Sequence, residues 1–135
     1  MNDNGGDIDI TGGAAYAGYG GDLNLFSGSG TSSSSGTVLI RTANAGMNGV
    51  SGPILLNTGT TSVGDSGYLS LTTGMANSGR AGYISLAVGS GNSGEGGYMS
   101  LAAGESTDVV GASGGYIQLK SGYSSLSSSG PMMLL

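Results

Sequence analysis

A glycine recurs at nearly constant spacing along this chain, and this repeat constrains the fold more than any other feature. The spacings between successive units are 15, 15, 16, 15, 15, 15, 18 and 15 residues. A fixed short period is typical of stacked structural units that contact mainly their neighbours. We therefore interpret residues 1–135 as one repeat domain, with units that begin at Gly6, Gly21, Gly36, Gly52, Gly67, Gly82, Gly97 and Gly115 and a partial unit from Gly130.

Each unit carries two aliphatic side chains, two and four positions after its glycine. This alternation is typical of a strand that turns one face to a core. A helix is disfavoured because glycine recurs too often and no stripe of 3.6-residue period exists. The predicted core consists of Ile8, Ile10, Leu23, Leu25, Val38, Ile40, Ile54, Leu56, Leu69, Leu71, Ile84, Leu86, Met99, Leu101, Ile117, Leu119, Met132 and Leu134.

Taken together, these patterns predict an all-β fold, a parallel β-solenoid of 15-residue repeats. Burying two aliphatic side chains contributes about 3–6 kcal/mol, whereas ordering the backbone of one unit costs about 15–30 kcal/mol. One unit therefore cannot fold alone. Odd and even units do not differ systematically, which favours a turn made of one unit; the alternative is a 30-residue coil made of two.

Glycine also follows nearly every predicted strand, for example at Gly13, Gly28 and Gly104. Glycine at such a place indicates either a positive φ or a very close backbone approach at a corner. The return arms are rich in Gly, Ser and Asn, and two of them, at 45–50 and 105–114, contain extra residues. Insertions of this kind are expected to bulge from one edge of a repeat structure.

Composition excludes several classes of function. Only 8% of the residues are charged and the net charge is −5, so neither a nucleic acid nor an anionic membrane surface is an expected partner. No apolar run approaches the ~20 residues of a membrane-spanning helix, so no membrane insertion is expected. The N-terminus shows no secretory signal peptide. An apolar content of 37%, placed at fixed phase, argues against disorder.

Catalysis is not predicted. The chain has neither histidine nor cysteine, so its many serines lack the base that a hydrolase needs. We expect no enzyme activity, no cofactor and no metal. The weak metal candidates are the carboxylates Asp7, Asp9 and Asp22, which we interpret as a solvated acidic end because they lack the nine-residue spacing of Ca²⁺-binding repeats.

A tyrosine directly follows the glycine in four units, at Tyr68, Tyr83, Tyr98 and Tyr116. In a stacked structure these side chains would form an outward column. Such a column would stabilise a sheet face by about 0.5–1.5 kcal/mol per aromatic pair. A flat aromatic strip that binds glycans or a neighbouring fibre is the alternative interpretation.

The units GYLSLTTGMANSGRA, GYISLAVGSGNSGEG and GYMSLAAGESTDVVGASG resemble the Gly/Ser-rich repeats of extracellular, adhesin-like β-solenoid proteins. The resemblance covers essentially the whole chain and implies a repetitive scaffold outside the cell or at its surface. Repeat-built ice-binding proteins are a weaker resemblance, since their ice faces carry regular outward threonines. Here Thr42, Thr58 and Thr73 have the inward phase.

The leading functional hypothesis is an extracellular structural repeat module that forms filaments or fibres. The chain ends partway through a unit, at Gly130-Pro-Met-Met-Leu-Leu, which leads us to expect end-to-end stacking of solenoids or a place within a longer surface array. Self-association is therefore the expected partnership, with glycans as a further partner. Ice binding and glycan adhesion through the tyrosine column are the alternative functions.

Overall fold

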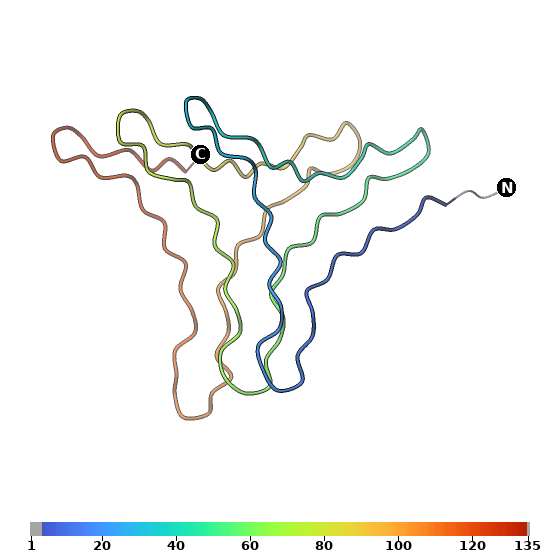
Figure 1. Ribbon diagram of the computed structural model, residues 1–135. Coiled ribbons are helices and arrows are strands. Elements are labelled where there is room, and N and C mark those ends of the chain that lie inside the picture. Colours follow the sequence, from blue (N-terminus) through green and yellow to red (C-terminus); the bar gives the residue numbers. More distant parts are fainter. Residues whose placement is uncertain (1–3, 135) are drawn as a thin grey trace. The chain divides into compact units, whose positions relative to one another are not determined.

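The computed structural model describes residues 4–134, and in this range the backbone contains neither a helix nor a strand. Extended segments alternate instead with closed loops, and Figure 1 shows both kinds of element along the trace. We use the name extended segments for the stretches that the repeat predicted as strands, none of which contains a bend or a turn. They comprise residues 6–13, 21–28, 36–43, 52–59, 67–74, 82–89, 97–104, 115–122 and 130–134.

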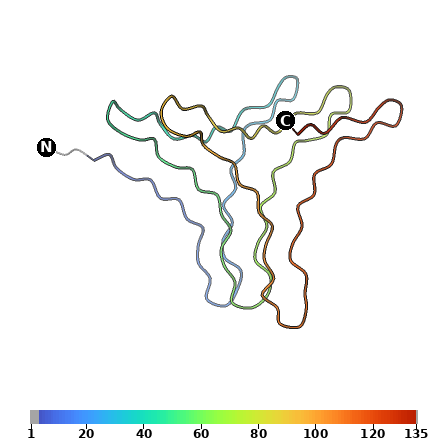
Figure 2. The ribbon, with the colours of Figure 1, turned by 180° about the vertical axis from the view of Figure 1, so that it is seen from behind.

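Every bend of the described backbone lies in one of the Gly/Ser-rich return arms. Figure 2, the reverse view, shows these arms as loops that bring the chain back on itself. The chain thus changes direction where glycine and serine are most frequent, as the repeat predicts. The bends and turns lie at residues 16–18, 31–33, 47–48, 62–64, 77–79, 92–95, 109–110 and 125–127.

Backbone hydrogen bonds hold the ends of several loops together. The first glycine of a unit donates its N–H to the carbonyl oxygen of the glycine that ends the preceding extended segment. We call this meeting point the loop neck. Necks of this kind join Gly21 to Gly13 at 2.8 Å, and Gly36 to Gly28, Gly115 to Gly104 and Gly130 to Gly122 at 2.9 Å each.

The prediction of an all-β parallel β-solenoid is wrong, because residues 4–134 contain no strand and no sheet. A solenoid needs ladder hydrogen bonds between successive turns of one chain. The backbone bonds observed in the described residues lie at loops, so neither a 15-residue nor a 30-residue coil forms. The alternation of side chains specifies which residues are extended and which face is apolar. It does not specify which other segment forms backbone hydrogen bonds with that extended segment.

The described residues also lack a core. Only Thr42, Ser106 and Ser124 are half-buried, and all others between 4 and 134 are exposed. The accessible surface is 13997 Å², for a mass of 13.0 kDa. A folded monomer of this mass exposes roughly 6,300 Å². The single chain therefore leaves in water the apolar surface that a globular domain would bury.

The two faces of an extended segment nevertheless differ in exposure. In segment 82–89, Ile84 is 53% and Leu86 is 65% exposed, whereas the neighbouring Tyr83 is 89% exposed. Local chain thus covers part of the aliphatic face and almost none of the tyrosine face. The predicted alternation is present, but the aliphatic side chains still expose about half of their surface.

By spatial clustering the chain divides into two units, Met1–Leu69 and Ser70–Leu135. Each contains extended segments and loops of the same kind, and the boundary falls inside segment 67–74 rather than in a loop. The prediction of a single repeat domain stays a prediction. Between residues 4 and 134 no helix is long and apolar enough to cross a membrane.

Amide hydrogen exchange will test this backbone at concentrations where the chain is monomeric. We expect the amides of Gly21, Gly36, Gly115 and Gly130 to exchange about two- to tenfold more slowly than amides inside the extended segments, because each donates a neck hydrogen bond. The measurement is exchange followed by NMR. Strong protection throughout segment 82–89 in the monomer would show that one chain forms a sheet, and would contradict the structure.

Candidate functional site

The loop neck is the local geometry that the repeat builds most regularly. In four of the necks an N–H···O bond of 2.8–2.9 Å closes the loop. The neck between Gly115 and Gly104 closes the longest loop, 105–114, with the same bond as the shorter ones. The three extra residues therefore lengthen the loop without changing how it is closed.

Close packing explains the glycine at the start of two units. A Cβ atom added to Gly21 would lie 2.9 Å from the backbone nitrogen of Gly13, and one added to Gly97 would lie 2.7 Å from Cγ1 of Val88. Both distances are shorter than real Cβ contacts. Glycine is needed at these two positions for close approach. The sequence had predicted a positive φ or a close approach for the glycines that end the segments instead, and this was wrong: a Cβ on Gly13, Gly28 or Gly104 would meet nothing within 4 Å, and none of the three has a positive φ.

The residue that faces the unit glycine comes from the end of the preceding extended segment, and it is always small or β-branched. A Cβ on Gly67 would meet Thr58 at 3.7 Å, and one on Gly36 would meet Ser27 at 3.4 Å. The hydroxyl of Thr73 also donates to the carbonyl oxygen of Gly82 at 3.3 Å. These side chains were predicted to flank the core, and in the single chain they pack against the necks.

Positive φ occurs within the loops rather than directly after the extended segments. Among the described glycines it is found at Gly64 (98°), Gly94 (76°) and Gly111 (103°). Side chains order the same loops: Thr61 donates its hydroxyl to the carbonyl oxygen of Val63 at 3.0 Å, and Asp108 accepts the N–H of Val110 at 2.9 Å. Local turn formation thus accounts for these polar groups without a ligand.

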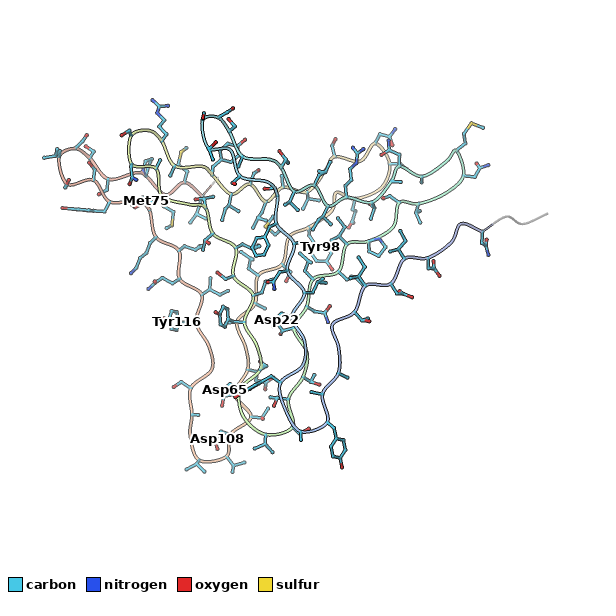
Figure 3. All side chains as sticks on the ribbon, viewed as in Figure 1. Asp22, Asp65, Met75, Tyr98, Asp108 and Tyr116 are labelled. Carbon is cyan, nitrogen blue, oxygen red and sulfur yellow. The ribbon has the colours of Figure 1, made fainter. Side chains whose placement is uncertain are left out.

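The candidate carboxylates do not form a metal site in the part of the chain that the structure describes. No group of three or more acidic side chains gathers there. Asp7 and Asp9 lie on segment 6–13, and Asp22, labelled in Figure 3, lies on segment 21–28; all three are exposed. The solvated acidic end that the sequence suggested stays a prediction.

The four tyrosines of the predicted column are almost fully exposed, at 82–89%. Figure 3 shows Tyr98 and Tyr116 on separate extended segments, not stacked on one another. The single chain therefore does not bring this pair together. An aromatic column, structural or glycan-binding, stays a prediction that requires a further level of assembly.

One hollow of about 300 Å³ lies where segment 36–43 enters the next loop. It is lined by Arg41, Thr42, Ala43 and Asn44. Its lining offers a guanidinium, a threonine hydroxyl and an amide, but no histidine, cysteine or carboxylate that could act as a base. Four neighbouring residues are also too few to enclose a cofactor.

The aliphatic pairs, which are the residues two and four positions after each unit glycine, form the repeated exposed apolar surface of the chain. The side chains predicted as core that lie between residues 4 and 134 are all exposed in the single chain. The sequence prediction missed apolar residues of the opposite phase that lie on the same segments. Leu39, Leu55 and Met133 are 71–79% exposed and could have been read directly from the runs VLI, ILL and MML.

Comparison with known proteins assigns no family. No protein-family model matches the chain, and no characterised protein or solved structure of significant similarity was found. The chain's own features remain as a guide to function, namely extended segments of low charge, closed loops and uncovered aliphatic pairs.

Substitution of the two glycines of one neck, Gly21 and Gly13, will test whether the backbone approaches closely there. Gly21→Ala should break the neck bond, because its Cβ would lie 2.9 Å from the nitrogen of Gly13. The amide of residue 21 should then exchange about two- to tenfold faster, as expected for the loss of one hydrogen bond. Gly13→Ala is the matched control, since its Cβ would meet nothing within 4 Å. Equal exchange of the residue 21 amide in both variants would argue against a packed neck.

Proposed function

We propose that this chain is an extracellular structural repeat module that assembles with copies of itself, or with neighbouring repeats of a longer array, into filaments or a surface layer. The observation that carries the proposal is the row of aliphatic pairs left 49–87% exposed along the extended segments. A place outside the cell is part of the proposal and rests on the resemblance of the repeats to extracellular scaffold proteins.

The amount of exposed surface supports association. The chain exposes about twice the area of a folded monomer of its mass. Apolar patches larger than a few hundred Å² on soluble proteins are usually interaction surfaces, and a stable interface buries roughly 1,200–2,000 Å². The surface exposed beyond that of a folded monomer, polar and apolar together, is several times that amount.

The mode of assembly differs from the one that the sequence suggested. End-to-end stacking of solenoids requires a coil with a regular terminal turn, and residues 4–134 form no such coil. The proposed association instead uses the sides of the extended segments, where the aliphatic pairs lie. The low charge content supports this, because 8% charged residues provide little repulsion between copies.

A matched pair of substitutions in one segment will test the proposal. Leu86→Asn places an amide of similar size in the aliphatic pair, and burying it without a partner is unfavourable. We expect assembly to require about tenfold higher protein concentration or more. Ser85→Asn introduces the same amide on the opposite face and should leave assembly unchanged. Sedimentation velocity and electron microscopy of both variants measure the effect.

A chain that stays monomeric at all concentrations, with no filaments or sheets by microscopy, would contradict a structural, self-assembling role. Equal assembly of the Leu86→Asn and Ser85→Asn variants would show that the aliphatic pairs do not drive association. The comparison of the two variants also informs on the wild-type chain, because each variant changes a single side chain.

Glycan binding is a second candidate, and the exposure of Tyr68, Tyr83, Tyr98 and Tyr116 favours it. Exposed aromatic rings can stack on the apolar faces of sugars. The assembled protein should then bind members of a glycan array, and Tyr83→Ser should weaken that binding several-fold while assembly persists. Unchanged binding by Tyr83→Ser would exclude this tyrosine. The ice-binding alternative gains no support from the described residues.

A further inference from the structure

The extended segments have unpaired backbone along both edges. Between residues 4 and 134 the backbone–backbone hydrogen bonds are the four neck bonds and one turn bond from Gly49 to Gly46. A few further backbone groups pair with side chains, such as the carbonyl oxygen of Gly82 with Thr73, and the others are left to water in the monomer. Burying the aliphatic pairs against another molecule would remove that water, and buried backbone groups almost always have protein partners.

We propose that the extended segments pair edge to edge between different copies of this chain, so that backbone ladder bonds exist only in the assembly. The inference rests on the proposed self-assembling role and specifies its interface. The partner is a second copy of the chain, and each segment lies beside the equivalent segment of that copy. The sheet is then a property of the oligomer and not of any one chain.

The loop necks explain why the partner comes from outside the chain. A neck joins only the glycine that begins one segment to the glycine that ends the preceding one. No ladder bond continues beyond a neck within the described residues, so where backbone bonds join successive segments they join only the ends. The full length of each segment stays available to a neighbouring molecule.

An equivalent segment of a second copy matches each edge better than any other partner. Pairing in register places Ile84 beside Ile84, Leu86 beside Leu86 and Tyr83 beside Tyr83, which forms the like-residue contacts that stabilise sheets. Charge does not oppose this register in the central segments. Residues 52–59, 67–74, 82–89 and 97–104 contain no Asp, Glu, Lys or Arg.

These neutral segments also lack the features that keep sheet edges apart. Natural edge strands carry lysine, proline or bulges that block pairing with another molecule. Segments 67–74, 82–89 and 97–104 contain none of these side chains. An uncovered, neutral and partly apolar edge is the surface expected of a segment that pairs between molecules.

The positions of the two prolines agree with backbone pairing. Pro53 and Pro131 are the only prolines, and each directly follows a unit glycine. Proline has no N–H to donate and is tolerated at the first position of a strand. All later positions of the extended segments keep their N–H groups, which is the arrangement that ladder pairing requires.

Proline substitution at two positions of segment 82–89 will separate backbone pairing from side-chain burial. Ser85→Pro removes an N–H from the middle of the segment, whereas Tyr83→Pro removes one at the place where the chain has Pro53. Both N–H groups lie on the same edge, because residues two apart share an orientation. We expect Ser85→Pro to raise the concentration needed for assembly about tenfold or more. Tyr83→Pro should raise it no more than Tyr83→Ala, which loses the same ring but keeps the N–H.

A single spin label will show whether the neighbouring segment belongs to another copy. The chain has no cysteine, so Ser85→Cys provides one labelling site per molecule. Labels on adjacent in-register segments would lie about 5 Å apart at the backbone and broaden the electron paramagnetic resonance spectrum. The broadening should disappear when labelled chain is mixed with a tenfold excess of unlabelled chain before assembly.

The outcomes distinguish the interface from the function. Assembly with equal tolerance of both prolines, or without spectral broadening, would overturn pairing between copies and leave the structural role standing. Failure of the wild-type chain to assemble at any concentration would overturn both. Broadening that dilution removes, together with selective loss of assembly in Ser85→Pro, would establish the inference.

Discussion

The need of backbone N–H and C=O groups for partners is the constraint on which this protein depends. Its loops meet that need locally, through neck bonds such as Gly21 to Gly13. Its extended segments do not, and they leave both edges to water. An apolar face flanked by unpaired backbone is unfavourable to bury unless the partner also supplies hydrogen bonds. This requirement restricts the partners that the segments can accept and favours chains of the same pattern.

Glycine has two separate physical roles in the repeat. At the start of a unit, as at Gly97, the absence of a Cβ lets the backbone approach the end of the preceding segment closely. Inside the loops, Gly64 and Gly94 have the positive φ that other residues avoid. The first role closes the loop and the second reverses the chain. Together they set the ends of each extended segment and therefore the length of edge that a second molecule can pair with.

The sequence predicted the alternation of extended segments and loops well, because the spacing of glycine and aliphatic residues determines both locally. It did not predict which glycines have positive φ. Gly13 and Gly94 are both repeat glycines beside small residues, but Gly13 ends an extended segment whereas Gly94 lies inside a loop. The β-solenoid was wrong because pairing between successive units is a long-range property. The tyrosine column and the role of Asp7, Asp9 and Asp22 could not be decided further, since exposed side chains on separate segments acquire neighbours only through assembly.

By itself the sequence determined the repeat, the two faces of each segment, the absence of histidine and cysteine chemistry, and the positions of the loops. Each of these follows from residue identity and spacing over a few residues. Only the tertiary structure decided that the loops close through glycine necks, that the segments of one chain stay unpaired, and that Ile84 and Leu86 are exposed. These features depend on where distant backbone groups lie in space, and a period of 15 residues fits pairing within a chain as well as pairing between chains.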